Sequence, residues 1–186
     1  MASRMSKKTR LTVAIVIIAV VAVVAIVLSR SLSSPSDSMP QSQNATDFTL
    51  PTMTGVNITL SELEGTPVVL NFWSIGCSAC RQQLPYLEDV AKQSGGEIKV
   101  IAINMADNAA NVQRFFGDYE PTMIVALDGK GEIFVNYCRD YKNPGYIPFT
   151  LFIDSESWVK YVKLGAFISV TELRNKLSSV FGITIH

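Results

Sequence analysis

The sequence predicts an α/β domain in which helices cover both faces of a mixed sheet, preceded by an N-terminal transmembrane helix. Three patterns lead to this prediction. Apolar runs typical of buried strands alternate with amphipathic helical patterns through the middle of the 186-residue chain. Two alternating segments near the C-terminus, 149–154 and 158–164, are joined by a short link and are typical of a hairpin. Residues 11–28 form an uncharged apolar stretch of membrane length.

The stretch 11–28 reads LTVAIVIIAVVAVVAIVL, in which one threonine interrupts seventeen apolar residues. As a helix rising about 1.5 Å per residue it would span roughly 27 Å, close to the hydrocarbon thickness of a bilayer. Basic residues precede it at Arg4, Lys7, Lys8 and Arg10. The positive-inside rule therefore predicts a single-pass protein of the cell membrane, with residues 1–10 in the cytoplasm and the rest outside.

A cleaved signal peptide is the alternative to this anchor. The apolar stretch is longer than the roughly 7–15 residues of a signal core, and the following VLSRSLSS has no A-x-A-like cleavage site. Both features favour an uncleaved anchor.

The segment that follows, 29–45, is predicted to be a flexible linker because it is rich in Ser, Pro, Gln and Asn. Residues 46–186 then form the extracytoplasmic domain. Beyond residue 30 the chain carries eleven basic and sixteen acidic residues, a net charge of −5. This charge argues against nucleic acid or an anionic membrane surface as a main partner. Outside the cytoplasm, disulfides persist.

The domain begins with DFTLPTMTGVNITL, which predicts two short strands separated by a turn at Thr54-Gly55. Ser61 is expected to cap a brief helical turn that ends at Gly65. The run 68–73 is apolar except for Asn71 and predicts a central strand buried on both faces.

A helix is predicted from Ser78 to the SGG at 94–96, because apolar residues recur at helical spacing through Val90, and Pro85 should kink it. The remaining elements follow in order. Strands are predicted at 98–104 and 122–128, helices at 108–118 and 133–141, the hairpin at 149–164 and a last helix at 171–181.

Two cysteines, Cys77 and Cys80, lie where the strand 68–73 gives way to this helix, in SIGCSAC. Free backbone N–H groups and the dipole at a helix start favour an anion, so the first cysteine forms a thiolate readily. Cys77 is therefore predicted to be the exposed nucleophile and Cys80 the buried resolving thiol. Exchange would proceed through a mixed disulfide that Cys80 releases.

The spacing of the pair is also compatible with a metal site or with a structural disulfide. A zinc site needs two more ligands, and the chain offers only Cys138 and the C-terminal His186, which argues against a metal. A purely structural disulfide closing so short a loop would constrain the unfolded chain very little. A working dithiol, without metal or other cofactor, is the favoured interpretation.

The segment FWSIGCSACRQQLP resembles the active-site segment of thioredoxins. Together with DFTLPTMTGVNITLSELEGTPVVLNFW, the membrane anchor and IPFTLFID, it resembles the TlpA/ResA-like branch, which comprises membrane-tethered extracytoplasmic thiol-disulfide oxidoreductases. The likeness covers residues 46 to about 181. It implies a thioredoxin-like fold with an N-terminal β-hairpin and an inserted element in the middle.

The resemblance also implies that Pro148 is a cis-proline beside the dithiol and that Ile147 lines a substrate groove, where its backbone can pair with a client chain. The other residues expected around this groove are Trp73, Gly76, Ser78 and Ala79. Gly76 replaces a tryptophan often found before the first cysteine, and this change is expected to open the groove.

Two positions depart from the family pattern. Asn71 stands where thioredoxins hold a buried carboxylate, and Gln83 stands where the TlpA/ResA-like branch commonly places a glutamate. An amide cannot relay protons, so Cys80 would lack the usual nearby base. These departures bear on the rate of exchange more than on the identity of the reaction.

The predicted function is exchange of the Cys77–Cys80 pair with cysteines of exported proteins. In the family a reducing role is commonest, including preparation of apocytochrome c cysteines for haem attachment, with electrons from a membrane dithiol donor. One alternative is a non-catalytic tethered binding module, which Asn71 and Gln83 keep open. A peroxiredoxin-type peroxidase fits less well, because the eight residues ending at Cys77, LNFWSIGC, lack the Pro and Thr of P-x-x-x-T-x-x-C.

The third cysteine, Cys138, lies in NYCRDYKNPGY. The favoured interpretation is a small buried hydrophobe in a helix. A resolving cysteine or an intermolecular bridge is the functional alternative.

Overall fold

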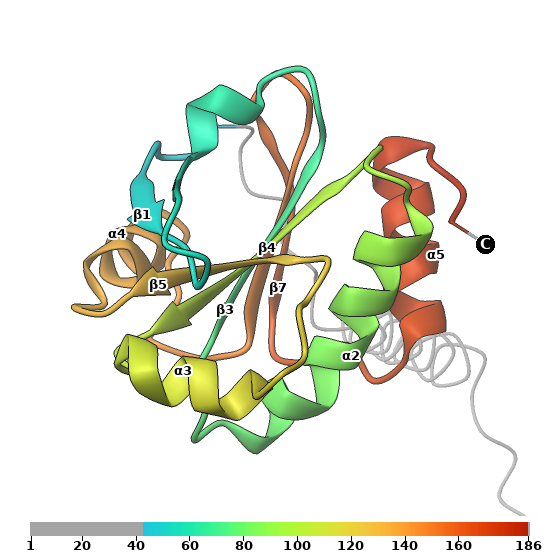
Figure 1. The fold of residues 1–186 in the computed structure, drawn as a ribbon. Helices are drawn as coiled ribbons and strands as arrows, with labels where there is room; N and C mark the ends of the chain where they lie inside the picture. Colours follow the sequence, from blue (N-terminus) through green and yellow to red (C-terminus); the bar gives the residue numbers. More distant parts are fainter. Residues whose placement is uncertain (1–42, 186) are drawn as a thin grey trace, which may run out of the picture. The chain divides into compact units, whose positions relative to one another are not determined.

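The computed structural model describes residues 43–185, and in this part of the chain a five-stranded sheet has the order β5-β4-β3-β6-β7 (Figure 1). The strands are β3 (Val68–Trp73), β4 (Lys99–Met105), β5 (Ile124–Asp128), β6 (Phe149–Ile153) and β7 (Val159–Leu164). β3, β4 and β5 run parallel, whereas β6 is antiparallel to both β3 and β7. The predicted mixed sheet is thereby confirmed.

Some predictions fall on segments that the structure does not describe. The transmembrane helix 11–28, the cytoplasmic residues 1–10, nearly all of the linker 29–45 and His186 lie outside the described residues. Among residues 43–185, no helix has the length and apolar character needed to cross a bilayer.

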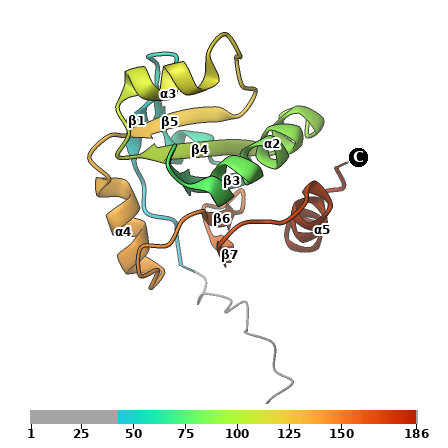
Figure 2. The same cartoon turned by 90° about the horizontal axis from the view of Figure 1, so that it is seen from below.

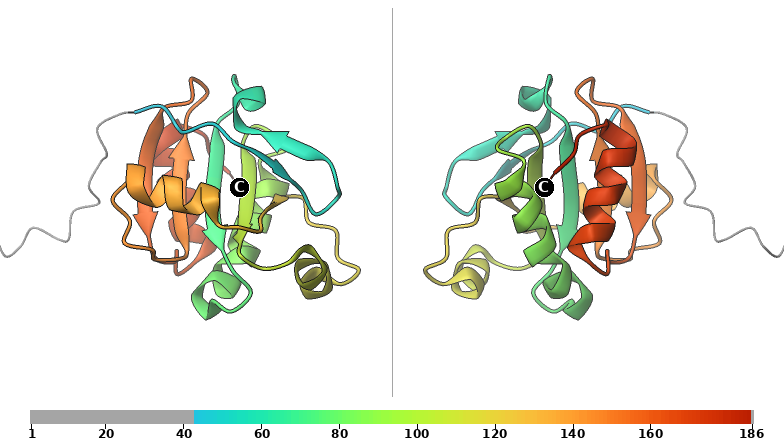
Figure 3. Two further views of the ribbon diagram at one scale, coloured as in Figure 1. Left: turned by 90° about the vertical axis from the view of Figure 1, so that its left-hand side faces the viewer. Right: turned by 90° about the vertical axis from the view of Figure 1, so that its right-hand side faces the viewer.

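Helices cover both faces of the sheet, as predicted (Figures 2 and 3). They are η1 (Leu60–Leu63), α2 (Ser78–Gln93), α3 (Ala109–Phe116), α4 (Glu132–Asp140) and α5 (Val170–Phe181). α2 and α5 pack on one face, whereas α4 lies on the other. The helix boundaries differ from the predicted ones by at most two residues.

The central strand β3 is buried along its whole length. Val69 and Trp73 belong to the apolar cluster under α2 and α5, whereas Leu70 and Phe72 belong to the cluster under α4. A strand covered on both faces needs apolar side chains at successive positions, which explains its unbroken apolar run.

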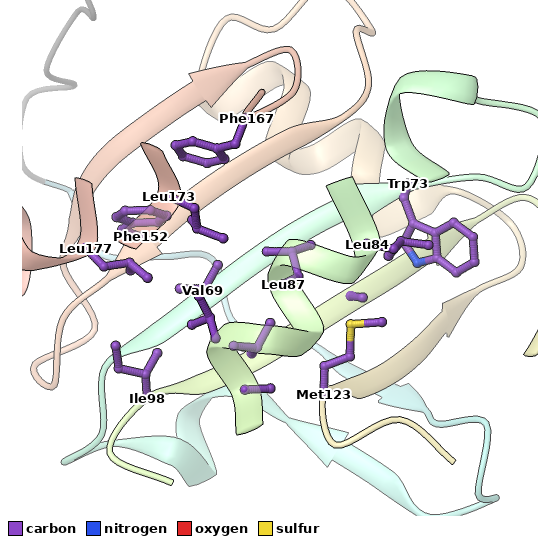
Figure 4. Packing of buried hydrophobic residues seen from close by; sticks show 14 of the residues in the cluster. Val69, Trp73, Leu84, Leu87, Ile98, Met123, Phe152, Phe167, Leu173 and Leu177 are labelled. Carbon is purple, nitrogen blue, oxygen red and sulfur yellow. The ribbon is translucent and has the colours of Figure 1, made fainter. Parts of the chain in front are cut away.

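The cluster under α2 and α5 holds the dithiol helix against the sheet (Figure 4). Leu84 and Leu87 of α2 enter it from one side and Leu173 and Leu177 of α5 from the other. The α2 residues recur three apart, so one helical stripe meets the sheet. α2 also continues beyond Pro85 to Gln93, so the proline does not end the helix.

The cluster on the opposite face is completed by α4 and by the predicted N-terminal hairpin, β1 (Thr49–Pro51) and β2 (Asn57–Thr59). The two strands pair antiparallel, and Gly55, at φ +83°, provides the left-handed residue of their turn. Phe48 and Leu50 bury their side chains beside Phe134 of α4.

The prediction that Ser61 caps the short helix after this hairpin is wrong. η1 begins at Leu60, so Ser61 lies inside it. Asp47 instead accepts hydrogen bonds from the Ser61 amide (2.9 Å) and from the Ser61 hydroxyl (2.8 Å). A carboxylate fourteen residues earlier therefore takes the role that was assigned to the local serine.

Candidate active site

Cys77 and Cys80 form a disulfide at the first turn of α2, with their Cα atoms 5.2 Å apart. Cys77 is the N-cap residue, and its Sγ accepts the Cys80 backbone N–H at 3.1 Å. Cys77 is half-buried, whereas Cys80 is only 1% exposed. A sulfur that accepts a helix N–H at the positive end of the dipole is stabilised as a thiolate. The geometry thus offers one accessible and one buried sulfur, the arrangement that stepwise disulfide exchange requires.

The Ile147–Pro148 peptide bond is cis, as the resemblance implied. It places the Ile147 carbonyl oxygen 3.8 Å from Cys77 Sγ. The sulfur of a disulfide carries no proton, so this is a contact rather than a hydrogen bond in the oxidised state. In the reduced state the Cys77 thiol can donate to the same oxygen.

The loop before the cis-proline is braced by Asn143, which is 5% exposed. Its side-chain oxygen accepts the backbone N–H groups of Gly145 (3.1 Å) and Tyr146 (2.8 Å), and its Nδ2 donates to the Tyr146 carbonyl (2.9 Å). Sequence reasoning did not identify Asn143, although the Asn-Pro-Gly sequence is a turn signal. Tyr146 itself is 64% exposed beside Ile147.

A network of neutral side chains lies behind the dithiol. Asn71 and Gln83, each 1% exposed, both donate to the hydroxyl of Thr150, at 2.9 and 3.3 Å. The Gln83 side-chain oxygen accepts the backbone N–H of Phe167 at 2.7 Å. The two departures from the family pattern therefore meet in one place, and Thr150, which sequence reasoning missed, joins them. These three side chains carry no charge, so they hold three segments together without offering a proton acceptor of carboxylate strength.

The other residues expected around the groove divide into two groups. Gly76 and Ser78 are exposed and Ala79 is half-buried, so they flank Cys77 at the surface. A Cβ added at Gly76 would meet nothing within 4 Å, which agrees with an open groove at this position. Trp73, in contrast, is 0% exposed.

The burial of Trp73 corrects its assignment to the groove. Its indole packs against Phe115 and Phe116, with ring centroids 5.3 and 5.9 Å away. Figure 4 shows the indole beside Leu84 of α2, and both side chains belong to the apolar cluster that also contains Cys80. Trp73 therefore supports the dithiol from within and cannot touch a substrate at the surface. The cause is its position at the end of a strand that is buried on both faces.

Cys138 lies in α4, half-buried against the cluster on the face opposite α2. Burial raises the pKa of its thiol. Cys138 packs against one face of the sheet, whereas Cys80 belongs to the cluster on the other face. Among the described residues, no group of three His, Cys, Asp or Glu side chains could hold a metal ion.

Fold and site together define the class: a thioredoxin-like thiol-disulfide oxidoreductase, with a Cys-x-x-Cys disulfide at a helix start and a cis-proline beside it. Comparison with known families agrees. The Redoxin family model matches residues 40–177, and the chain belongs to this family. Its relatives place it in the TlpA/ResA-like branch.

Three relatives illustrate the match. The thioredoxin-like protein YneN of Bacillus subtilis is 30% identical over 153 residues, which span 81% of this chain and 86% of YneN. The thiol-disulfide oxidoreductase ResA of the same species is 28% identical over 130 residues, 69% of this chain and 70% of ResA. A crystal structure from Chlorobium tepidum, provisionally described as the thiol:disulfide interchange protein DsbE, matches with a TM-score of 0.66 at 27% identity, covering 78% of this chain and 100% of that one.

Proposed function

We propose that the protein reduces disulfides in exported proteins at the outer face of the cell membrane, using Cys77 as nucleophile and Cys80 as resolving thiol. The observation that carries the proposal is the asymmetry of the pair. The half-buried Cys77 sulfur accepts a hydrogen bond from a helix N–H. Cys80, whose sulfur reacts only in the second step, is 1% exposed.

The steps follow from this asymmetry. The Cys77 thiolate attacks one sulfur of a client disulfide; that S–S bond breaks and the other client sulfur leaves as a thiolate. The Cys80 sulfur, after passing its proton to a thiolate or to water, attacks Cys77 Sγ and releases the second client thiolate. The client gains two electrons and the Cys77–Cys80 disulfide forms. A membrane dithiol donor then returns two electrons to the pair.

The proposed location rests on the sequence of the N-terminal region. Residues 11–28 have membrane length; four basic residues precede them closely, whereas only Arg30 follows closely. An anchored domain outside the cytoplasm would meet unfolded exported chains, which form disulfides there. Apocytochrome c is one client class that the family resemblance suggests, since its cysteines must be reduced before haem is attached.

The test is to trap the client. A Cys80→Ala variant of the full chain should accumulate mixed disulfides at Cys77 in cells, because the resolving thiol is gone, and mass spectrometry identifies the partner. The Cys77→Ala variant is the matched control and should trap far less. Mixed disulfides in neither variant would contradict the proposal and favour a non-catalytic binding module. Peroxide consumption that survives in Cys80→Ala would instead indicate a peroxidase.

The midpoint potential of the Cys77–Cys80 pair tests whether the protein reduces or oxidises its clients. Known dithiols of this fold range from about −270 to −120 mV. A reductase requires a midpoint potential near the negative end of this range, which a titration against glutathione and dithiothreitol buffers determines. A potential near −120 mV would overturn the reducing role and leave an oxidase.

A further inference from the structure

The backbone of one residue in front of the dithiol is held through both of its peptide groups. Ile75, two residues before Cys77, donates its backbone N–H to the Asp107 carboxylate at 2.8 Å. Its carbonyl oxygen accepts a hydrogen bond from the guanidinium of Arg81 on α2. Asp107 lies 32 residues beyond Ile75 in the chain, and neither charged residue belongs to the Cys-x-x-Cys motif.

The topology brings Asp107 to this loop. β3 and β4 are parallel, so they end at the same edge of the sheet, where Trp73 is the register partner of Asn104 (Figure 1). Asn104 is 0% exposed and donates its Nδ2 to the same Asp107 oxygen at 2.9 Å. Asp107 is therefore fixed by the buried end of β4.

The backbone before Asp107 departs from ordinary preferences. Ala106 has φ +66°, in the left-handed region that costs a non-glycine residue about 1 kcal/mol or more. Its N–H donates to the carbonyl of Asp128 at the end of β5, at 3.0 Å. The turn that aims Asp107 at the dithiol loop is thus maintained against local conformational preference, as is common at functional sites.

Besides these two bonds, the half-buried Ile75 side chain packs against the cluster under α2 and α5. Gly76 has no side chain, and a Cβ there would meet nothing within 4 Å. A turn bond from the Cys77 N–H to the Ser74 carbonyl, at 3.2 Å, closes the loop without tying it to the rest of the domain. The two bonds at Ile75 add directional polar ties to this apolar packing, one to the segment after β4 and one to α2.

We propose that Asp107 and Arg81 are positioning residues that hold the loop before Cys77, so that the Cys77 sulfur stays against the Cys80 N–H. The proposal rests on the proposed role of Cys77 as the reacting thiol. Neither residue takes part in the exchange of electrons. Each acts through the backbone of Ile75. The hydrogen bond that depends on them is the 3.1 Å one from the Cys80 backbone N–H to Cys77 Sγ.

The charge of Asp107 and the position of its acceptor oxygen have opposite expected effects on the pKa of Cys77, which makes the proposal testable. The negative charge of Asp107 disfavours a thiolate nearby, so removing charge alone should lower the pKa of Cys77. Displacing the Asp107 acceptor should raise the pKa of Cys77, because the loop would move and the thiolate would lose the Cys80 N–H as its donor. Asp107→Asn keeps an acceptor oxygen and removes the charge, whereas Asp107→Glu keeps the charge and displaces the acceptor.

The other charged groups near the site are the same in all the Asp107 variants, so they cannot cause a difference between them. Arg81 on α2 faces the Ile75 carbonyl, and Asp128 lies behind the turn at Ala106. On the β7–α5 side, Lys163 and Glu172 pair with each other at 3.1 Å. A difference between the Asn and Glu variants therefore reports on Asp107 itself.

The experiment measures alkylation of Cys77 against pH in the reduced full chain, with mass spectrometry to separate Cys77 from the other cysteines, together with exchange with a small aromatic disulfide. Asp107→Asn should alkylate and exchange as the wild type does, with an unchanged or lower pKa. Asp107→Glu should show a raised pKa and roughly tenfold slower exchange, the effect of losing one well-formed hydrogen bond. Asp107→Ala should exchange slowly as well.

Asp154 provides a matched control. It accepts the backbone N–H groups of Glu156 and Trp158, both at 2.9 Å, in the β6–β7 turn. Asp154→Asn and Asp154→Glu should lower the melting temperature without moving the Cys77 profile. The proposal is overturned if Asp107→Glu leaves the pKa of Cys77 and the exchange rate at their wild-type values, or if the Asn and Glu variants shift that pKa equally. A wild-type Cys77 that alkylates no faster than a free cysteine would instead overturn the proposed function.

Discussion

Gln83 and Thr150 join the dithiol helix to the cis-proline strand, with the Gln83 amide nitrogen 3.3 Å from the Thr150 hydroxyl. Gln83 lies one helical turn after Cys80, and Thr150 lies two residues after Pro148. The two halves of the site therefore meet through an uncharged contact. Because the contact is uncharged, it holds over the whole pH range in which the domain is folded.

Replacing Gln83 by glutamate should introduce a proton acceptor beside Cys80. Burial disfavours the charged form and raises the pKa of a carboxyl group at this position. Above that pKa, resolution of a Cys77 mixed disulfide should be faster than in the wild type. Rapid acid quench of a preformed mixed disulfide measures this step. Gln82→Glu is the control, since Gln82 is exposed at the preceding position of α2. Equal pH profiles for both variants would contradict the prediction.

The same variant should also change stability with pH. A carboxyl whose folded pKa is raised binds more protons in the folded state than in the unfolded state. Its contribution is therefore present below the unfolded pKa and is lost as the pH rises through the folded pKa. Gln83→Glu should be less stable in urea at pH 8 than at pH 5, relative to wild type, whereas Gln82→Glu should not differ.

The ionised Glu88 side chain should contribute to the unfolding free energy of the domain at neutral pH. Burial opposes its charge, but hydrogen bonds from the amides of Met123 (3.0 Å) and Thr122 (2.9 Å) and from the Tyr119 hydroxyl (2.8 Å) hold the pKa of Glu88 below its usual value. They tie α2 to the segment before β5. Glu88→Gln should cost about 1–3 kcal/mol of unfolding free energy at pH 7.

The pH dependence at Glu88 has a definite sign. A carboxyl with a depressed folded pKa contributes stability above its unfolded pKa, and this contribution is lost as the pH falls through the folded pKa. The difference between wild type and Glu88→Gln should therefore shrink between neutral pH and pH 3 in urea titrations. Glu97→Gln, at an exposed carboxylate beyond the end of α2, should be close to wild type throughout. A constant difference at all pH values would count against the assignment.

Elements with a local signature were predictable from the sequence. The burial of β3 on both faces and the apolar stripe of α2 both follow from periodicity, which any window of the chain displays. The cis form of Pro148 came from the family resemblance and not from composition. Ser61 shows the limit of local reasoning, because the residue that does the capping, Asp47, lies fourteen positions earlier in the sequence and on the other side of the hairpin.

The supporting residues of the site could not be predicted for the same reason. Asn71 and Thr150 are 79 positions apart and Ile75 and Asp107 are 32 apart, and such contacts leave no periodic trace in the sequence. The family resemblance also placed Trp73 in the groove. Its side chain instead lies in the interior, in the same apolar cluster as Cys80.

Asn143 should control the shape of the loop that faces a client. Replacing it by alanine removes the acceptor of two backbone N–H groups and the donor to the Tyr146 carbonyl. The loop should then exchange its amide hydrogens faster at Gly145 and Tyr146, and the KM for a peptide disulfide should rise. Alkylation of Cys77 should stay near the wild-type rate, because α2 is untouched. Unchanged hydrogen exchange at these amides would refute the prediction.

Leu87 should be one of the costliest core positions. It is 0% exposed in the cluster that holds α2 against the sheet. Leu87→Ala should lower the unfolding free energy by about 2–5 kcal/mol through lost burial and an unfilled cavity. Val135→Ala on α4, at a residue 61% exposed, should stay within about 0.5 kcal/mol of wild type. Similar midpoints in guanidinium chloride for the two variants would show that α2 is not anchored in this way.

The placement of Cys138 has a practical consequence. The chain has three cysteines, and while Cys77 and Cys80 are bonded to each other only Cys138 retains a thiol. It lies on α4, across the sheet from the dithiol helix. A maleimide dye coupled there, or a gold electrode to which the protein is attached through that sulfur, would leave Cys77 and Cys80 themselves unmodified. Burial slows the coupling, since it raises the pKa of the Cys138 thiol, so mildly alkaline buffer favours single-site attachment.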